Sequence, residues 1–419
     1  MTGYSRFISA TSASRQPSAI RALVPYLSRP GTISLGGGNP NSKTFPFVSL
    51  KFGLQDGEEV SVNKPQEIFQ YSGTNGMAPL LLSLNAIQTA NHAHPGKNPQ
   101  SIFVSTGSQD SLTKAFEMCL DEGDSILLED YTYSGSLAFL KPLGRRLVPV
   151  KTDNEGILPN NLDTILTQWD HANKKPKVLY TIPTGSNPTG MSISMERRQD
   201  LYRVAQKHDL LILEDDPYYY LQLDDERLDS LYSMDTDSRV IRFDSFSKIL
   251  SSGLRLGFAT GPSELIDRLA LHGQATSLHT SGVSQGITSA LFEHWARKHN
   301  DQNGLLGFEL HVKEVVGFYK KQRKHFLDCA EKHLTGLCEW HSPQAGMFLW
   351  VKLLASTPRF STAAFAQKLI EEEGVLVVPG IHFSPQGLDV PYIRMSFSTA
   401  TPEEMNQALE RIGSLLRQV

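Results

Sequence analysis

The chain has 419 residues, of which 40% are apolar and 20% are charged, a composition typical of a globular protein. The net charge of −4 excludes the strongly basic surface that nucleic-acid binding requires, and no run of about 18 apolar residues predicts a membrane-spanning helix. The three cysteines are widely spaced and odd in number, so we expect neither a disulfide framework nor a metal site.

The N-terminal region is unusual because no Asp or Glu precedes Asp56, while arginines are spread among serines. This composition can indicate a transit peptide, or else an arm that packs on the folded body. Pro17, Pro25 and Pro30 interrupt the continuous amphipathic helix that a transit peptide needs, which favours the arm. We therefore expect a cytoplasmic protein, with mitochondria as the alternative compartment.

From about residue 100, short apolar runs alternate with helical stretches such as 109–120 and 194–207. Several runs are apolar at successive positions, as expected for strands that are covered on both faces. The predicted strands are residues 101–105, 125–129, 147–150, 177–182, 210–213, 240–243 and 256–260. This alternation predicts an α/β fold with a mostly parallel seven-stranded sheet covered by helices.

The C-terminal part follows another pattern, with long helical stretches leading into short strands. Strands are predicted at residues 345–351, 375–378 and 392–397, and helices at 360–373 and 402–416. Thr401 can cap the last helix, because Pro402 suits its first position and two glutamates suit its dipole. We expect an N-terminal arm at residues 1–45, a large domain at 46–310 and a small α+β domain at 311–419.

Lys248 ends the run Asp244-Ser245-Phe246-Ser247-Lys248, and Arg255 follows seven residues later. A lysine amine forms an imine with an aldehyde when desolvation or nearby positive charge keeps it partly deprotonated. The hydroxyls of Ser245 and Ser247 and the guanidinium of Arg255 can bind a phosphate. A lone lysine would be an ordinary surface residue, but these neighbours match the needs of an aldehyde cofactor that carries a phosphate.

Residues 105–109 follow a predicted strand and open a predicted helix. Free N–H groups and the dipole attract anions to a helix start, and Gly107 allows a close approach of the backbone. Ser108 and Gln109 are therefore candidate phosphate ligands, although many helices begin in this way without binding anything.

Two further candidates follow predicted strands. Asp215 comes after the apolar run 210–213, at the carboxyl end of a strand, where sheets of this kind bind ligands. Its carboxylate can pair with a protonated ring nitrogen, and the alternative is an ordinary Asp-Asp-Pro turn. Asn187, in Asn187-Pro188-Thr189-Gly190, is either a turn residue or a donor to a ring hydroxyl.

Two tyrosines and an arginine complete the candidates. Tyr218 could share the ring oxygen with Asn187, and Tyr133 could stack on a flat ring, although buried aromatic residues usually serve the core. Arg394 interrupts an apolar strand, and an inward-facing guanidinium needs a carboxylate or phosphate partner. The alternation of the strand equally allows Arg394 to face water.

Together these residues resemble the fold-type-I pyridoxal-phosphate enzymes of the class I and II aminotransferase group. The matching motifs extend from residues 34–47 to Arg394, nearly the whole chain, and their joint occurrence in this order is specific. The likeness is strongest to kynurenine/α-aminoadipate and aromatic-amino-acid aminotransferases, and it is carried by residues 36–41, 70–72, 214–219 and 244–248.

The resemblance implies a homodimeric transaminase that uses pyridoxal 5′-phosphate to move an amino group from an L-amino acid to a 2-oxo acid such as 2-oxoglutarate. It implies that Lys248 holds the cofactor aldehyde and moves the substrate proton, and that Asp215 binds the ring nitrogen. Asn187 and Tyr218 would hold the ring hydroxyl, and Tyr133 would stack on the ring.

The resemblance also implies the remaining ligands. The phosphate would be held by Ser108, Gln109, Ser245, Ser247 and Arg255, and Tyr71 would reach the phosphate of the neighbouring subunit. Arg394 would bind the substrate α-carboxylate, with Asn187 beside it, and Arg21 and Gly38 would lie near the substrate side chain. The N-terminal arm forms part of the active site in this group.

Two departures and three alternatives stay open. Asn39 stands where relatives usually carry an apolar residue, which leaves the substrate preference undecided, and Tyr131 replaces a common proline. A β-lyase on the same scaffold would need no acceptor oxo acid. An aminotransferase-like transcription regulator would need a winged-helix module before the sheet. A doubly wound dehydrogenase would need a Gly-x-Gly-x-x-Gly motif after its first strand.

Overall fold

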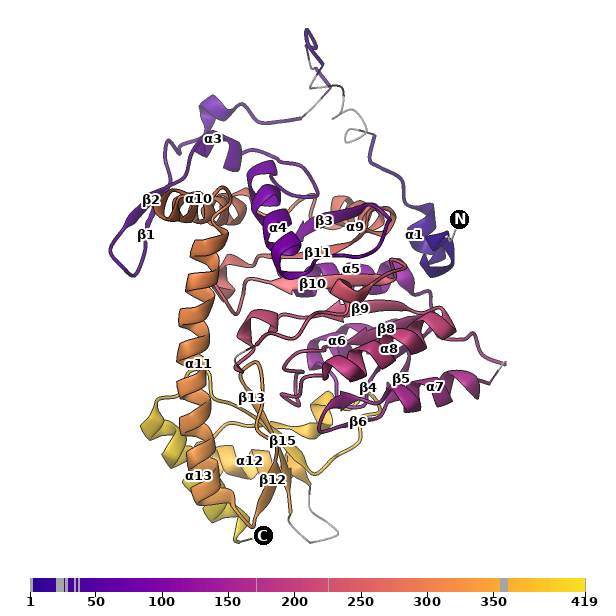
Figure 1. Ribbon diagram of the computed structural model, residues 1–419, viewed down its shortest axis with the longest axis vertical. Helices are drawn as coiled ribbons and strands as arrows, with labels where there is room; N and C mark the ends of the chain where they lie inside the picture. Colours follow the sequence, from indigo (N-terminus) through magenta and orange to yellow (C-terminus); the bar gives the residue numbers. More distant parts are fainter. Residues whose placement is uncertain are drawn as a thin grey trace. The chain divides into compact units, whose positions relative to one another are not determined.

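The computed structural model describes residues 3–19, 26, 29–33, 35–36, 38–170, 172–224, 226–354 and 361–418. The chain divides into two compact units, which we call unit 1 (Met1–Asp121 and Tyr232–His311) and unit 2 (Glu122–Leu231 and Val312–Val419). The predicted division at residues 45 and 310 stays a prediction. All seven predicted strands of the large sheet are present, three in unit 1 and four in unit 2 (Figure 1).

One of the three large-sheet strands of unit 1 runs against the other two. β11 (Gly257–Pro262) lies between β3 (Gln100–Ser105) and β10 (Val240–Ser245) and runs antiparallel to both. Every residue of β10 and β11 is buried, and the two charged residues of β10, Arg242 and Asp244, pair with each other at 2.9 Å. A strand that is covered on both faces shows no sign of its direction in its sequence, so only the structure identifies β11 as the antiparallel one.

The long helices in the described part of unit 1 include α4 (Ala78–Asn91), α5 (Ser108–Cys119), α9 (Ser263–Thr276) and α10 (Gly282–His299). In α5, Leu112, Ala115, Phe116 and Cys119 are buried, the spacing of one helix face, and α5 packs on α9 and on the strands. The shorter elements are η1 (Tyr4–Phe7), α1 (Ala10–Ser14), η3 (Ser42–Thr44), β1 (Lys51–Gly53), β2 (Glu59–Ser61), α3 (Pro65–Ile68), η6 (Tyr232–Met234) and η7 (Ser252–Leu254).

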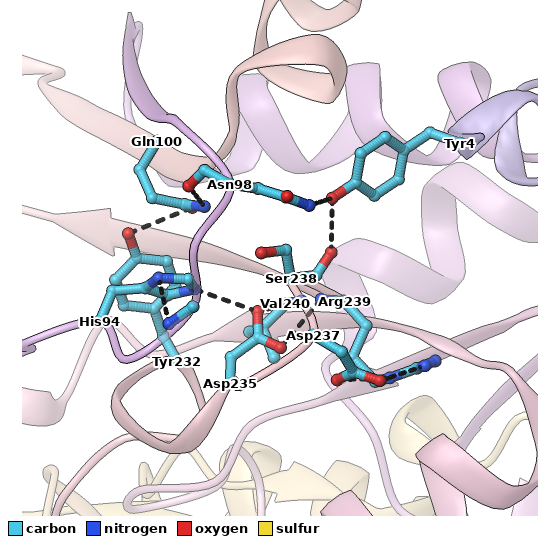
Figure 2. Close-up of polar contacts among 11 residues, drawn as sticks. Tyr4, His94, Asn98, Gln100, Tyr232, Asp235, Asp237, Ser238, Arg239 and Val240 are labelled. Carbon is cyan, nitrogen blue, oxygen red and sulfur yellow. Dashed lines mark hydrogen bonds and ion pairs between the residues drawn. The ribbon is translucent and has the colours of Figure 1, made fainter. Parts of the chain in front are cut away.

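The N-terminal residues pack on the folded body of unit 1 (Figure 2). The Tyr4 hydroxyl donates to the Ser238 carbonyl at 2.9 Å, and Asn98 Nδ2 donates to the Tyr4 oxygen at 3.1 Å. Phe7 is only 1% exposed, and the Ser9 N–H donates to the Met118 carbonyl at 2.7 Å. That the whole arm of residues 1–45 lies at the active site stays a prediction.

Asp235 ties the turn before β10 to the loop after α4 (Figure 2). Its carboxylate accepts the backbone N–H groups of Arg239 at 2.9 Å and Val240 at 3.0 Å. His94 Nε2 lies 3.4 Å from Asp235 Oδ2, and the Gly96 N–H donates to His94 Nδ1 at 3.1 Å. Because Nδ1 accepts, the ring proton is on Nε2 and points to the carboxylate. This contact fixes the start of the strand that leads to Lys248.

The large-sheet strands of unit 2 are all parallel, as predicted. β8 (Val178–Thr181) lies between β4 (Ser125–Glu129) and β9 (Leu211–Asp215), and β5 (Arg146–Val150) pairs with β4 on its other edge. β4, β8 and β9 are buried at every position. The helices that connect these strands are α6 (Ser134–Leu140), α7 (Pro159–Thr167) and α8 (Met195–His208). The carboxyl ends of parallel strands therefore meet at one edge of this sheet.

A second sheet in unit 2 is antiparallel, in the order β12 (Cys338–Trp340), β13 (Phe348–Leu353), β15 (Tyr392–Ser396) and β14 (Val378–Pro379). Helices α12 (Thr362–Glu373) and α13 (Pro402–Leu416) accompany it, and α11 (Leu305–Leu334) begins in unit 1 and ends in unit 2. Thr401 and Glu404 form a capping box on α13, which confirms the predicted cap. The shorter elements of unit 2 are η4 (Lys141–Leu143), β6 (Thr152–Asp153), β7 (Gly156–Ile157), η5 (Tyr219–Leu221) and η8 (Gly380–Phe383).

Neither a membrane-spanning helix nor a cluster of metal ligands occurs among the described residues. No helix in the described ranges has both the length and the apolar character that crossing a bilayer demands. Across the same residues, no group of three His, Cys, Asp or Glu side chains is arranged to hold a metal ion.

Candidate active site

Lys248 lies in a short turn directly after β10 and is half-buried. The carbonyl of Phe246 accepts the N–H groups of the three residues 249–251, at 3.2, 2.8 and 3.2 Å. The Phe246 ring is buried and packs near Phe258 and Phe292, with ring centroids 5.8 and 6.3 Å apart. The aromatic cluster therefore anchors the turn and fixes the position of the lysine backbone.

A cradle for an anion lies in the same unit, where Arg255 meets the start of α5. Arg255 Nη1 donates to Ser247 Oγ at 3.3 Å, and the Ser247 N–H donates to Ser245 Oγ at 3.2 Å. Gly107 precedes α5 with φ +77°, and a Cβ placed there would lie 2.5 Å from Arg255 Nη2. Only glycine allows the guanidinium to approach the helix start this closely.

Gly257 brings the lysine strand and the helix start together. A Cβ on Gly257 would lie 2.5 Å from the backbone nitrogen of Ser108 and 2.7 Å from the carbonyl oxygen of Asp244. The predicted phosphate ligands Ser108, Ser245, Ser247 and Arg255 are thus gathered in unit 1, and Gln109 is the second residue of α5.

The donors of this cradle fit a phosphate. They are a helix N-terminus, serine hydroxyls and a guanidinium, which all favour a multiply charged anion. Asp110 adds a negative charge in the first turn of α5, but it pairs with Lys114 and accepts the Thr106 N–H at 3.2 Å. Arg255 itself has φ +48°, a left-handed conformation that is uncommon for a residue with a side chain and is frequent at ligand-binding sites.

In unit 2, Asp215 ends β9 and is buried. Its Oδ2 accepts a hydrogen bond from the Tyr180 hydroxyl at 2.8 Å, and Tyr180 in turn accepts one from Ser136 Oγ at 3.0 Å. A carboxylate at the carboxyl end of a parallel strand suits a protonated ring nitrogen. Sequence reasoning overlooked Tyr180 and Ser136; a tyrosine within the apolar run 178–182 was the available signal.

Asn187 and Tyr218 lie together with Arg394. Arg394 Nη1 donates to Asn187 Oδ1 at 2.8 Å, and Asn187 also forms a hydrogen bond with the Tyr218 side chain. Burial, and then the charge of Asp215, raises the pKa of the Tyr218 phenol far above its usual range. The phenol therefore remains a hydrogen-bond donor for a ring oxygen at any physiological pH.

Arg394 is half-buried between two phenyl rings. Its guanidinium carbon lies 4.2 Å from the centroid of Phe348 and 5.0 Å from that of Phe383. Its Nε is buried without a hydrogen-bond partner, and Arg394 forms no ion pair with a carboxylate among the described residues. Burial lowers the pKa of Arg394, which shows how poorly solvated this cation is. Of the two orientations that the sequence allowed, the structure therefore shows Arg394 facing inward, where it can receive an anion.

Tyr133 precedes α6, and its ring lies over the backbone of Gly135, where a Cβ would lie 2.5 Å from the Tyr133 ring. Its phenol acts electrostatically on Tyr218 and on Arg394. Unit 2 therefore gathers the predicted residues Tyr133, Asn187, Asp215, Tyr218 and Arg394. Their roles towards a ligand stay predictions.

Glu129 is a buried carboxyl that the sequence reasoning missed. It ends β4 as Asp215 ends β9, and that parallel was the available signal. Its oxygens accept hydrogen bonds from Thr181 Oγ1 at 2.7 Å, Ser186 Oγ at 2.8 Å and the Ile182 N–H at 3.0 Å. Burial raises the pKa of Glu129 to about 7, against these three hydrogen bonds, which lower it. Glu129 thus holds the segment that leads to Asn187.

The structure of the single chain does not test the predicted roles of three residues. Tyr71 is 54% exposed, and its ring centroid lies 5.9 Å from that of His279. Gly38 is exposed, and a Cβ there would meet no atom within 4 Å. Arg21 lies outside the described residues. The roles of all three stay predictions.

Comparison with known proteins places these observations in a family context. A family model described as "Aminotransferase class I and II" matches residues 32–412. The mitochondrial kynurenine/alpha-aminoadipate aminotransferase of Bos taurus is 41% identical over 436 residues, covering 99% of each chain.

Solved structures agree with this match. The aminotransferase Aro8 from Candida albicans superimposes with a TM-score of 0.89 at 29% identity, over 99% of this chain and 98% of that one. The kynurenine aminotransferase of Pyrococcus horikoshii, solved in complex with PMP, KYN and KYA, gives a TM-score of 0.78 at 26% identity, over 100% and 98%.

Proposed function

The chain belongs to the class I and II aminotransferase family and is therefore a transaminase of the pyridoxal-phosphate-dependent class, and we propose that its amino donor is kynurenine, α-aminoadipate or an aromatic amino acid. The acceptor in this proposal is a 2-oxo acid such as 2-oxoglutarate. The name of the bovine relative supports the first two donors, and the name of the Pyrococcus structure supports kynurenine.

The observation that carries the cofactor proposal is the anion cradle beside the Lys248 turn. When bound, pyridoxal phosphate supplies an electron-withdrawing ring that makes the substrate Cα–H acidic. Ser108, Ser245, Ser247 and Arg255 would hold the phosphate, with Gln109 beside them. Lys248 Nζ would attach the cofactor and, once displaced by the substrate amine, would move the proton of Cα.

The residues of unit 2 complete the proposal. The Asp215 carboxylate would accept the ring N–H, the hydroxyl of Tyr218 and the amide of Asn187 would hold the ring oxygen, and Tyr133 would lie against the ring. Each group has the donor or acceptor that its partner on the cofactor needs, and burial of Asp215 protects its charge from water.

Substrate recognition is proposed for Arg394. Its guanidinium has no carboxylate partner among the described residues and can bind the α-carboxylate of an amino acid with two hydrogen bonds. Phe348 and Phe383 flank it and offer apolar surfaces to an aromatic side chain. Arg21 and Gly38 are proposed to lie near the substrate side chain by resemblance alone.

Reduction with borohydride tests the cofactor assignment. Treated protein that is then digested should carry a pyridoxyl group on the peptide that contains Lys248, and the Lys248→Ala variant should lose this label, the visible absorbance and nearly all turnover. Lys43→Ala changes an exposed lysine and should behave as wild type. A label on another peptide, or full turnover by Lys248→Ala without added amine, would refute the assignment.

A panel of amino donors with 2-oxoglutarate tests the substrate proposal. Turnover per active site should be highest for kynurenine, α-aminoadipate or aromatic donors, and it should stop when the oxo acid is omitted. Release of ammonia without an acceptor would instead identify the alternative, a β-lyase.

A homodimer is proposed because unit 1 exposes apolar side chains that water does not favour. Ile33, Leu35 and Val48 are 88%, 95% and 83% exposed, and Tyr71 is 54% exposed. We propose that a second copy covers this segment and that Tyr71 acts on the phosphate of the neighbouring subunit.

Mixing two inactive variants tests the shared site. Tyr71→Ala and Lys248→Ala chains, unfolded and refolded together, form hybrid dimers in which one site has both residues intact. Random pairing restores about a quarter of wild-type activity if Tyr71 acts across the dimer. No recovery above the two separate variants would show that Tyr71 acts within its own chain, and a monomer in light scattering would refute the dimer.

The cellular compartment is proposed from the relatives and from the N-terminal residues. The bovine relative is named as mitochondrial, whereas the sequence favoured the cytoplasm. In either compartment we propose that Tyr4 and Phe7 remain in the mature protein, because both are buried in unit 1. Mass spectrometry of N-terminal peptides from fractionated cells would identify the compartment, and a mature form that begins after Phe7 would refute this proposal.

A further inference from the structure

Tyr180 reaches Asp215 because of the register of two parallel strands. Tyr180 in β8 lies opposite Leu213 in β9, and Leu213 and Asp215 face the same side because side chains alternate along a strand. The phenol therefore points towards the carboxylate, and the two oxygens are 2.8 Å apart.

Ser136 extends this contact into a chain of three residues. Ser136 Oγ lies 3.0 Å from the Tyr180 oxygen, and all three side chains are buried. A carboxylate only accepts hydrogen bonds, so the phenol proton points to Asp215 and the phenol oxygen accepts the Ser136 proton. Burial, followed by the charge of Asp215, holds the pKa of Tyr180 well above its usual range, so the phenol stays a donor.

We propose that Tyr180, aligned by Ser136, is a positioning residue that orients the Asp215 carboxylate and weakens its attraction for the proton on the cofactor ring nitrogen. The inference rests on the proposed function, in which Asp215 holds that nitrogen. A hydrogen bond stabilises the anionic form of a carboxylate and makes it less basic. Tyr180 would thus keep the proton on the ring, where it withdraws electrons.

Other titratable groups also lie near these three residues. Glu129 also raises the pKa of Tyr180, with less effect than Asp215. Tyr218 responds to the charge of Asp215. Glu214 lies on the opposite strand face, where its Oε1 accepts the N–H of Leu231 at 2.7 Å.

Removing the Tyr180 hydroxyl should shift the pH midpoint of the visible absorbance in one direction. Without the Tyr180 donor, the Asp215 carboxylate becomes more basic and draws the ring proton closer to itself. A bound cofactor ring would then withdraw less charge, so a Lys248 nitrogen attached to it would be more basic. The pH midpoint of the visible absorbance of the loaded enzyme, which reports protonation of that nitrogen, should therefore rise.

Absorbance titration of the holoenzyme from pH 5 to 9 measures this midpoint independently of turnover. Tyr180→Phe should raise it by about half a pH unit or more, and Ser136→Ala should raise it less. Tyr232→Phe is the matched control, since it also removes a buried phenol hydroxyl, one that donates to Gln100 Oε1 at 3.3 Å. Its midpoint should equal that of wild type.

A double variant separates positioning from general damage. In an Asp215→Asn background the carboxylate charge is absent, so adding Tyr180→Phe should no longer move the midpoint. An unchanged or lowered midpoint in Tyr180→Phe, or the same shift in the Asp215→Asn background, overturns the proposal. If the Tyr180→Phe variant does not bind the cofactor, the Ser136→Ala variant provides the test. An unchanged absorbance midpoint in Ser136→Ala then overturns the proposal.

Failure of the underlying function has a different signature. If borohydride leaves no label at Lys248 in the wild-type enzyme, the cofactor assignment itself is wrong. If the label is present and the midpoint does not respond to Tyr180→Phe, only the role of Tyr180 is refuted.

Discussion

Replacing Glu129 by glutamine should change how the stability of the protein depends on pH. Burial raises the pKa of this carboxyl from 4.5 to about 7, and the side chain is surrounded by three hydrogen-bond donors. The folded protein holds the proton more tightly than the unfolded chain does. The stability that the proton contributes is therefore complete below pH 4.5 and is lost as the pH rises through about 7.

The size of this effect follows from the two pKa values. The difference between about 7 and 4.5, at about 1.4 kcal/mol per pH unit, corresponds to about 3 kcal/mol of unfolding free energy. Glutamine does not titrate, and its amide can still accept from Thr181 and Ile182 and donate to Ser186. The unfolding free energy of the Glu129→Gln variant should therefore lack the pH-dependent contribution of this carboxyl.

Urea unfolding at several pH values between 4.5 and 8 measures the effect. The free-energy difference between wild type and Glu129→Gln should move by about 3 kcal/mol across this range, with wild type losing stability as pH rises. Glu122→Gln, which changes an exposed glutamate, is the control and should show a constant difference. A constant difference for Glu129→Gln as well would refute the reasoning.

Three further substitutions test other parts of the structure. Gly107→Ala places a side chain at a positive φ, which costs about 1–3 kcal/mol, and pushes its Cβ against the Arg255 guanidinium. A cofactor titration of the apoenzyme should therefore show at least about tenfold weaker binding. Arg394→Lys should lower kcat/KM by about a hundredfold through loss of paired hydrogen bonds, while the dissociation constant of the cofactor stays unchanged. Thr401→Ala removes the capping box of α13 and should lower the unfolding free energy by about 1 kcal/mol in urea titrations, with unchanged turnover.

The fold was largely predictable because its signals are local. Strands covered on both faces are usually rich in apolar residues, and all seven predicted strands exist. The helix cap at Thr401 also depends only on neighbouring residues. The three-residue strand β12 escaped prediction, since so short a segment has no periodicity and is stabilised by pairing with β13.

The candidate site was likewise predictable in part. The sequence was enough to predict a role for each of five residues, because all of them belong to motifs that can be recognised along the chain: Lys248, Arg255, Asp215, Asn187 and Arg394. Reading Arg394 as inward-facing needed the structure, because alternation along a strand does not say which face is covered.

The amino-acid sequence by itself determined the class of fold, the candidate lysine and the groups that suit a phosphate, because these depend on residue type and short spacing. Only the tertiary structure decided that Glu129 is buried among hydroxyls and that Tyr180, aligned by Ser136, donates to Asp215. These contacts join residues between 35 and 57 positions apart, and the basicity of a carboxyl depends on the burial and the donors that folding places around it.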